Sequence, residues 1–525
     1  MTNSRRSRFF NTTGPCNPER HYMLAPEERL VGAQLSRYIT DELYWVLHAP
    51  RQTGKTTFLQ SWARHINASD KYIACYVSLE DCQGKETTEE AMRTIYRAIC
   101  YYAEVAELPV PLLDDLSPEG LLRTTLLKWS VQVAPKSLVV LFDEVDVLTG
   151  APVIDFLRQL RGGFAIRGIG KFPTSVVLVG MRDLKDYITA SKEGIAPNPG
   201  SPFNIKADSA VLSNFSQEDI KHLFAQHTTE TGQEITQEAL DYVWEQSKGQ
   251  PWIVNNLFMR ATMRVLDAES TETVSINHVY EARKQMIAAR ETHFDALGKR
   301  LTDPRVKHVV QTIISGDSDP QMGRMNPDVE LVMDLGLVTW SSEKGFIIAN
   351  PIYEEILTQQ LNSGYHDSLP APSTWKWQSA DGNLDMNSLL HEFQGFWRKH
   401  ADIWEQKADY TEVFPHLLLM AFLQRILNGG GRIEREFAAG RGRMDLAVEY
   451  NNQWFIIEIK ILHDYDTTKE IKEEGLKQIA HYRDKIAPAA PAYLVIFDRR
   501  SETKKLPWNE RIAWMEERDI AVLGC

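Results

Sequence analysis

Short apolar runs alternate with amphipathic stretches over the first third of the chain. Four of these runs are largely continuous: YWVLHA at 44–49, KYIACYVSL at 71–79, SLVVLF at 137–142 and SVVLVGM at 175–181. Continuous runs of this length indicate strands that are buried on both faces, as in a parallel sheet covered by helices. The pattern therefore predicts a doubly wound α/β core.

After residue 212 the pattern becomes helical. SQED at 216–219 is a capped helix start, and Leu240, Val243 and Trp244 follow at helical spacing, with no strand-like run up to about residue 290. A further helical stretch precedes LGLVTW and GFIIAN, which flank the polar turn SSEKG. Helices followed by one short hairpin predict a winged-helix module.

The segment NSGYHDSLPAPSTWKWQSADG is rich in Pro, Ser, Gly and Asp, which is typical of a linker. Beyond it, helices extend to about residue 427, and REFAA, MDLAVEY, WFIIEIKI and AYLVIF read as strands around one helix, EEGLKQIAHYRDKI. The predicted domains are an α/β core (1–212), a helical lid (213–295), a winged-helix module (296–362), a linker (363–382) and a second, smaller α/β domain (383–525).

Composition narrows the functional classes. The 525 residues exclude a single small binding module, and 58 basic against 71 acidic side chains give a net charge of −13. A site for nucleic acid must therefore be a local basic patch. The five cysteines are widely spaced, which argues against a disulfide framework or a structural zinc site. With no apolar run long enough to span a bilayer, we expect a cytoplasmic protein without a membrane partner.

A phosphate-binding loop is predicted directly after the first strand, in APRQTGKTTFLQSW. There a glycine lets backbone N–H groups close on phosphate, Lys55 reaches the β and γ oxygens, and the Thr56 hydroxyl ligates Mg²⁺ at a helix N-terminus. Ala49 stands where the usual pattern begins with glycine, and a chance GKTT on a surface turn is the alternative. The predicted nucleotide-binding residues here are Ala49, Gln52, Thr53, Gly54, Lys55, Thr56 and Thr57.

A second nucleotide motif lies in LVVLFDEVDVL, where an apolar strand ends in Asp143 and Glu144. An aspartate at the carboxyl end of a strand can hold Mg²⁺, and the adjacent glutamate can polarise the water that attacks the γ-phosphate. The alternative is a strand that ends in a solvated acidic turn.

Residues 9–365 resemble the bacterial AAA-like ATPases related to STAND NTPases and archaeal-type ATPases. The resemblance rests on GPCNPERHYML, VLHAPRQTGKTTFL, FDEVDVL, FLRQLRGGF, GMRDLKDY, SPFNI, SKGQPWIVNNL and LGLVTW with IANPIYEEIL. It implies that residues 54–56 are Walker A, that Asp143 and Glu144 are Walker B, and that Arg182 lies in the sensor-1 region. It also implies a lid motif at Gly249 and Pro251.

Four further residues carry weaker hypotheses. Arg158 and Arg161 are candidates for charge-stabilising fingers across a subunit boundary, although arginines on an exposed helix are more often solvated or paired. Tyr22 and Arg29 are candidates for the border of the base pocket.

The C-terminal domain holds a second candidate site in GRGRMDLAVEYNNQWFIIEIKI. Period-2 alternation places Glu458 and Lys460 on one strand face, and the preceding hairpin can return Asp445 beside them. The two carboxylates suit Mg²⁺, and the lysine suits the orientation or deprotonation of a water that attacks a phosphodiester. The alternative is two amphipathic strands whose charged faces are solvated.

This segment resembles the RecB-like branch of the PD-(D/E)XK nuclease superfamily over residues 385–525, although Met444 stands where proline would precede the aspartate. The resemblance rests on the order helix Glu, D, E-x-K and Q-x-x-x-Y. It implies a core of Asp445, Glu458 and Lys460. The supporting residues are Glu412, Gln478 and Tyr482.

Four arginines lie shortly before Asp445 in the sequence and form the candidate basic patch for nucleic acid. Ion pairing to Glu434 and Glu436 is the alternative role for them. The four arginines are Arg432, Arg435, Arg441 and Arg443.

Together these features predict a bacterial ATPase whose nucleotide state controls a fused Mg²⁺-dependent nuclease that cleaves DNA, in defence against foreign DNA such as phage. ATP and Mg²⁺ are the expected cofactors, and assembly into a homo-oligomer on nucleotide binding is expected. The main alternative is a nucleotide-dependent switch or DNA-remodelling ATPase whose C-terminal domain binds nucleic acid without cutting it. A mobile-element helper ATPase is a third hypothesis, which a second metal site disfavours.

Overall fold

The protein divides into two compact units, residues 1–290 with 334–336, and residues 291–333 with 337–525. The computed structural model describes residues 8–25, 29–30, 32–167, 171–181, 205–267, 271–289, 292–315, 323, 326–342, 345–366, 383–405, 418–420, 422–423, 431–437, 444–450, 453–463, 466–486, 489–498, 500, 502–503, 506, 514–517 and 519–525.

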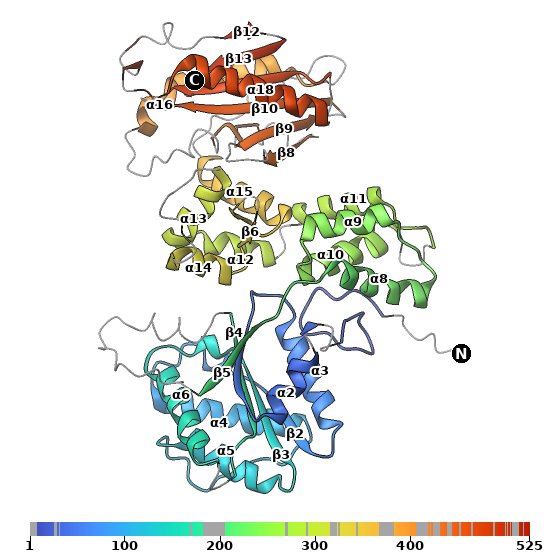
Figure 1. Ribbon diagram of the computed structural model, residues 1–525, viewed down its shortest axis with the longest axis vertical. Coiled ribbons are helices and arrows are strands. Elements are labelled where there is room, and N and C mark those ends of the chain that lie inside the picture. The colour runs from blue at the N-terminus through green and yellow to red at the C-terminus, as the bar shows by residue number, and fades with distance from the viewer. Residues whose placement is uncertain are drawn as a thin grey trace. The chain divides into compact units, whose positions relative to one another are not determined.

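The first unit is built on a five-stranded parallel sheet (Figure 1). Its strands are β1 (Tyr44–His48), β2 (Tyr72–Ser78), β3 (Ser137–Asp143), β4 (Ser175–Gly180) and β5 (Lys206–Val211), in the order β2-β3-β4-β1-β5. The four strands expected from the apolar runs are confirmed. Strand β5 was not predicted, because its sequence KADSAV contains no apolar run. It is an edge strand that pairs only with β1.

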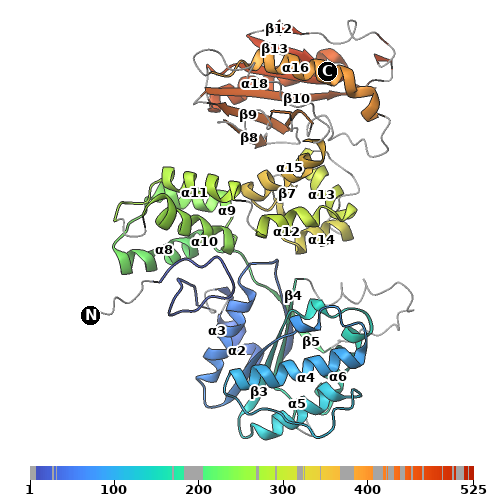
Figure 2. The ribbon, with the colours of Figure 1, turned by 180° about the vertical axis from the view of Figure 1, so that it is seen from behind.

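Helices cover both faces of this sheet, as Figure 2 shows from behind. Along β1, Trp45 and Leu47 belong to the core layer beneath two helices, whereas Tyr44 and Val46 belong to the opposite layer. This is the period-2 alternation of a strand buried on both sides. The first layer holds α2 (Gly32–Thr40) and α3 (Lys55–Asn67); the opposite layer holds η1 (Glu80–Cys82), α4 (Thr88–Val105), α5 (Leu121–Gln132), η2 (Val145–Val147) and α6 (Gly150–Ala165).

The helices predicted to form the lid follow β5, and the name lid is kept for them below. Its elements are α8 (Gln217–Thr231), α9 (Gln237–Ser247), α10 (Pro251–Arg260), the π-helical turn η3 (Ala261–Val265) and α11 (Ile276–Ala288). The capped start expected at residues 216–219 is confirmed, because Ser216 and Asp219 form a reciprocal capping box at α8. The N-terminal segment packs on the lid, where Phe10 stacks with Phe224 and the Trp252 indole donates to the carbonyl of Thr12.

The second unit begins with helices and one hairpin. They are α12 (Thr292–Arg300), α13 (Pro304–Ser315), α14 (Pro327–Asp334), β6 (Val338–Ser341), β7 (Gly345–Ile348) and α15 (Pro351–His366). The expected hairpin is present, with Trp340 packed edge-on against Phe346. Its assignment as a winged helix, like the division into five domains, stays a prediction.

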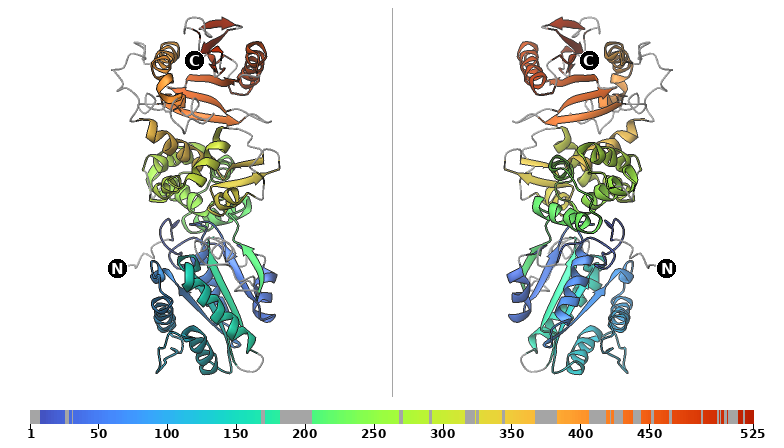
Figure 3. Two further views of the ribbon diagram at one scale, coloured as in Figure 1. Left: turned by 90° about the vertical axis from the view of Figure 1, so that its left-hand side faces the viewer. Right: turned by 90° about the vertical axis from the view of Figure 1, so that its right-hand side faces the viewer.

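A six-stranded mixed sheet forms the C-terminal part, in the order β12-β13-β11-β10-β9-β8. Its elements are α16 (Met386–Glu405), β8 (Gly431–Phe437), β9 (Met444–Tyr450), β10 (Gln453–Leu462), α18 (Thr468–Ile486), β11 (Ala492–Asp498), β12 (Met515–Glu517) and β13 (Ile520–Gly524). The sheet lies between α16 and α18 (Figure 3). On β11, Phe497 packs against Trp397 of α16, whereas Leu494 faces Gly475 of α18.

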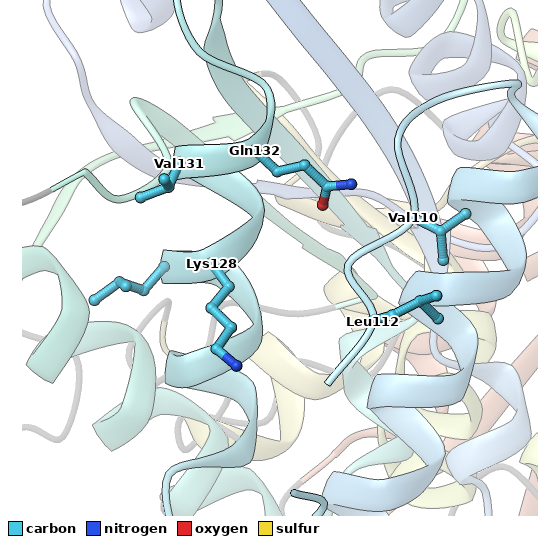
Figure 4. Close-up of a pocket in the computed structure, with 6 residues that line it drawn as sticks. Val110, Leu112, Lys128, Val131 and Gln132 are labelled. Atoms are coloured by element: carbon cyan, nitrogen blue, oxygen red, sulfur yellow. The ribbon is translucent and has the colours of Figure 1, made fainter. Parts of the chain in front are cut away.

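A surface hollow of about 430 Å³ lies on the first unit, between α5 and the loop that precedes it (Figure 4). None of the predicted site residues lines it. Its lining residues are Val110, Leu112, Leu127, Lys128, Val131 and Gln132.

All five cysteines, each of which lies in a described part of the chain, are free thiols. Within the ranges that the structure describes, no helix combines the length and the apolar character needed to cross a bilayer.

Candidate nucleotide site and candidate nuclease site

The candidate phosphate-binding loop connects β1 to α3. Gly54 caps α3 in the left-handed region, at φ 88°, and Gln52 also has a positive φ, at 59°. Ala49 does not have a positive φ, and it is buried at the end of the strand. Since its backbone is ordinary, this position does not need the glycine that the usual pattern begins with.

Lys55 points back over this loop. Its ammonium donates to the carbonyl oxygens of Ala49 at 2.7 Å and of Pro50 at 2.8 Å. Burial lowers the pKa of Lys55, and the nearby Asp143 carboxylate opposes that shift. Two neutral carbonyls compensate a buried ammonium less well than an anion does, so phosphate oxygens are favourable replacements for them.

Thr56 and Asp143 meet as the sequence predicts. The Thr56 hydroxyl donates to Asp143 Oδ2 at 2.7 Å, and the backbone N–H of Glu144 donates to Oδ1 at 3.0 Å. Burial raises the pKa of the Asp143 carboxyl, while the bond from Thr56 opposes this shift. A hydroxyl and a carboxylate are hard oxygen ligands, so the pair fits Mg²⁺, directly or through water.

Glu144 follows β3 in the left-handed region, at φ 56°. Its half-buried carboxylate accepts a hydrogen bond from the Ser78 hydroxyl at 3.4 Å. Burial and the neighbouring Asp143 both raise its pKa, which suits a group that takes a proton from water. A non-glycine residue at positive φ stores strain that the surrounding structure must hold.

Two residues of β2 take part in this site and were missed from the sequence. Ser78 pairs in register with Asp143, and Tyr76 lies two residues earlier on the same strand face. The Tyr76 hydroxyl donates to Asp143 Oδ2 at 3.2 Å. The available signal was the presence of polar residues at the end of an apolar strand. Only the pairing of β2 with β3 shows that these residues lie beside Asp143.

Arg29 joins the loop to the lid. Its guanidinium donates to the carbonyl of Thr53 at 3.0 Å and to that of Ser213, where the lid begins, at 2.6 Å. It also lies over the Phe215 ring, 4.7 Å from the centroid. Burial lowers the pKa of Arg29 to about 10, so the side chain stays charged at neutral pH. The hypothesis that it borders the base pocket stays a prediction.

Other predicted residues also tie the loop to its surroundings. The Gln250 amide of the lid donates to the Gln52 carbonyl at 3.3 Å, and Pro251 is the first residue of α10. Thr57 Oγ1 accepts the backbone N–H of Cys16 at 2.9 Å. The loop, the lid and the N-terminal segment therefore form one connected structure.

Gly249, in the predicted lid motif, contacts Phe215 closely. Gly249 lies at φ 75°, and its carbonyl accepts the backbone N–H of Phe215 at 2.8 Å. A Cβ on Gly249 would come within 1.9 Å of the Phe215 carbonyl oxygen. Position 249 therefore requires glycine for two reasons, its left-handed backbone conformation and the close approach of the Phe215 carbonyl oxygen.

Replacement of Gly249 by alanine is expected to lower the thermal stability of the protein clearly more than replacement of Gly232. Both glycines have φ 75°, so both variants incur the left-handed penalty of about 1–2 kcal/mol. Only Gly249 meets a neighbour; nothing lies within 4 Å of a Cβ on Gly232. The clash adds about 1–3 kcal/mol. Thermal unfolding of both variants measures the difference, and equal melting temperatures would contradict the close contact.

The remaining nucleotide-site candidates are less informative. The Tyr22 hydroxyl contacts Glu230 of the lid at 3.3 Å. Arg158 and Arg161 lie exposed on α6, and their role as fingers stays a prediction. Arg182 lies outside the described residues.

The candidate nuclease centre lies on β9 and β10. In this antiparallel pair Leu446 is opposite Ile457, so Asp445 and Glu458 are the next residues of the two strands. Glu458 and Lys460 are completely buried, with Lys460 Nζ 2.8 Å from Glu458 Oε1. The expected shared strand face is confirmed, and the alternative of solvated charges is wrong for this pair. The oxygens of the Glu458 carboxylate are of the kind that hard divalent cations prefer as ligands.

Helix α18 supplies two more groups around Lys460. Gln478 accepts a hydrogen bond from the Lys460 ammonium through Oε1, and its role as an active-site helper stays a prediction. Glu474, which the sequence analysis missed, lies 3.2 Å from the same ammonium. The signal was available, because Glu474 precedes Gln478 by four residues and so shares its helix face.

Several candidates lie beyond what the structure describes. Glu412, Arg441 and Arg443 lie outside the described residues. The backbones of Asp445 and Tyr482 are placed in β9 and α18, and those of Arg432 and Arg435 in β8, whereas their side chains are not described. The basic patch and these supporting roles stay predictions.

Comparison with known proteins bears on both sites. Residues 410–496, which contain β8 to β10, α18 and most of β11, match the family model of the PD-(D/E)XK nuclease superfamily. This part of the chain is similar to PD-(D/E)XK nucleases. The match includes Asp445, Glu458, Lys460 and Gln478, in agreement with the resemblance drawn from the sequence. No curated protein sequence matches the chain.

Among solved structures, the Walker-type ATPase PABY2304 of Pyrococcus abyssi covers 66% of this chain and 99% of its own, at 12% identity and a TM-score of 0.47. Cdc6p from Pyrobaculum aerophilum covers 66% and 97%, at 12% identity and a TM-score of 0.37. The RuvB Holliday junction branch migration motor of Thermotoga maritima covers 62% and 93%, at 13% identity and a TM-score of 0.34. The candidate nucleotide site therefore rests on the residues of this chain and their contacts.

Proposed function

We propose that this protein is an ATPase whose nucleotide state controls a Mg²⁺-dependent nuclease in the same chain. The observation that carries the proposal is the presence of two separate clusters of reactive side chains in one chain. A phosphate-binding loop with Lys55 and the Thr56–Asp143 pair stands in the first unit, and the fully buried Glu458–Lys460 pair stands in the second.

At the nucleotide site each side chain has a separate task. Lys55 leaves the loop carbonyls and binds the β and γ phosphate oxygens. Thr56 and Asp143 hold Mg²⁺, which offsets phosphate charge when it is bound. Glu144 orients the attacking water and accepts its proton, and its raised pKa brings it nearer the working pH.

At the nuclease site Asp445 and Glu458 would hold Mg²⁺, which would lower the pKa of a bound water. Lys460 stands beside Glu458, where its ammonium orients the nucleophile and offsets phosphate charge. Gln478 and Glu474 hold this ammonium from the helix side. The lysine is therefore fixed from the strand and from the helix, as a positioned catalytic group needs to be.

The finer assignments follow the resemblance to STAND-like ATPases. We infer that DNA is the substrate, that ATP binding promotes assembly of a homo-oligomer in the cytoplasm, and that the biological role is defence against foreign DNA such as phage. Support for the ATP control comes from the lid, which contacts the phosphate-binding loop through Arg29 and Gln250. A ligand that binds one lid position better than another shifts the population of the two.

The test is cleavage of plasmid DNA, single-stranded DNA and RNA by the full-length protein with Mg²⁺, with no nucleotide, ATP or a non-hydrolysable analogue. We expect DNA cleavage that depends on nucleotide, together with a change in oligomeric state measured by light scattering. Cleavage at the same rate in all three nucleotide conditions would contradict ATP control. Binding of DNA without cleavage in every condition would favour the alternative of a nucleotide-dependent switch.

A further inference from the structure

We propose that Tyr76 is a positioning residue for magnesium at the nucleotide site. The inference rests on the proposed ATPase function, and it concerns a side chain on β2 that belongs to neither nucleotide motif. Its hydroxyl donates to Asp143 Oδ2 at 3.2 Å, and the Thr56 hydroxyl donates to the same oxygen at 2.7 Å.

The Asp143 carboxylate is therefore held on both sides. Oδ2 accepts two hydroxyl donors, from Thr56 and Tyr76, while Oδ1 accepts the backbone N–H of Glu144 at 3.0 Å. Asp143 is only 1% exposed, so water supplies little of this stabilisation. Three donors fix the plane of the carboxylate, and its remaining lone pairs are available to a metal or to the water bound on it.

The ring of Tyr76 is itself fixed. Tyr102 of α4 packs against it edge-on, with ring centroids 5.3 Å apart and an interplanar angle of 88°. The strand places Tyr76 opposite Leu141, two residues before the end of β3 where Asp143 lies. The hydroxyl thus reaches Asp143 from a rigid strand and a packed ring, which is how an outer group orients a metal ligand.

The test is nucleotide binding rather than turnover. Affinity for a fluorescent ATP analogue is measured in EDTA and then across a Mg²⁺ titration, for the wild type, Tyr76→Phe and Tyr44→Phe. Tyr44→Phe is the matched control, because it also removes a buried tyrosine hydroxyl. That hydroxyl donates to the Pro173 carbonyl at 2.8 Å, and Tyr44 is the first residue of β1, at the end of the strand opposite the loop.

We expect Tyr76→Phe to bind nucleotide normally in EDTA but to need about tenfold more Mg²⁺ for half of the full gain in affinity, the usual effect of one hydrogen bond to a charged group. Tyr44→Phe should match the wild type in both conditions. A wild-type Mg²⁺ titration for Tyr76→Phe would overturn the inference, and so would an equal loss of affinity with and without Mg²⁺. Absence of nucleotide binding by the wild type would instead contradict the proposed ATPase function.

A second variant guards against a fold defect. Tyr102→Leu removes the ring that fixes Tyr76 but leaves every donor to Asp143 in place. A shift of the Mg²⁺ requirement in the same direction, smaller than for Tyr76→Phe, supports the positioning role. A shift larger than that of Tyr76→Phe would mean that packing, and not the hydroxyl, sets the metal affinity.

Discussion

Loss of the Lys460 ammonium should lower Mg²⁺-dependent cleavage of DNA by about 10²–10⁴-fold and leave ATP hydrolysis unchanged. That range is typical for removal of a positioned acid, base or charged group at a reaction centre. Lys460 is completely buried between Glu458 and the helix groups Glu474 and Gln478. The measurement is initial cleavage rates of Lys460→Met and the wild type at equal protein concentration.

The control must separate chemistry from folding, because removal of one partner of a buried ion pair leaves an uncompensated charge that costs about 3–5 kcal/mol. The double variant Glu458→Gln/Lys460→Met removes both charges at similar volume and should fold better than the single variant while remaining inactive. Lys477→Ala, on the exposed side of α18, should cleave normally. Cleavage by Lys460→Met at the wild-type rate would show that the nuclease centre lies elsewhere.

Lys55→Ala should lower ATP hydrolysis at least about 100-fold, the usual effect of losing one preorganised charge at a phosphoryl-transfer site. The Lys55 ammonium lies within the loop, where it donates to the carbonyl oxygens of Ala49 and Pro50. The described residues of this loop contain no second lysine that could replace it. Phosphate release measured with saturating ATP and Mg²⁺ gives the rate. If nucleotide controls the nuclease, the same variant loses the ATP dependence of cleavage.

Lys71→Ala is the matched control for Lys55→Ala. Lys71 is exposed and precedes β2, at the end of the sheet opposite the loop, so its loss removes a charge of the same sign without touching the site. Equal rates for Lys55→Ala and the wild type would contradict the assignment of the phosphate-binding loop. Equal losses in both variants would point to a general effect of net charge.

The sequence predicts those parts of the fold and sites that depend on one segment at a time. Continuous apolar runs locate β1 to β4, and the end of β3 locates Asp143, because these are local features of strands buried on both faces. Period-2 alternation likewise places Glu458 beside Lys460. Strand β5, with the sequence KADSAV, lacks such a pattern, because it lies at the edge of the sheet and pairs with β1 alone.

What the sequence does not predict depends on which segments become neighbours. Tyr76 and Ser78 matter only because β2 pairs with β3, and Glu474 only because α18 packs on β10. No spacing within β2 carries that information, and the four-residue spacing of Glu474 and Gln478 shows only that the two share a helix face. The sequence alone does not show which polar residues outside a motif take part in a site, because this depends on strand order and on helix packing.

The course of the chain at β5 has a mechanical consequence. The backbone N–H of Leu212, directly after β5, donates to the carbonyl of His48 at 3.2 Å, and His48 is the last residue of the strand that leads into the phosphate-binding loop. The start of the lid and the start of the phosphate-binding loop are therefore both attached to the carboxyl end of β1. Movement of the lid relative to the loop would therefore require backbone rotation at residues 213–215 and the loss of hydrogen bonds made by Arg29 and Gln250.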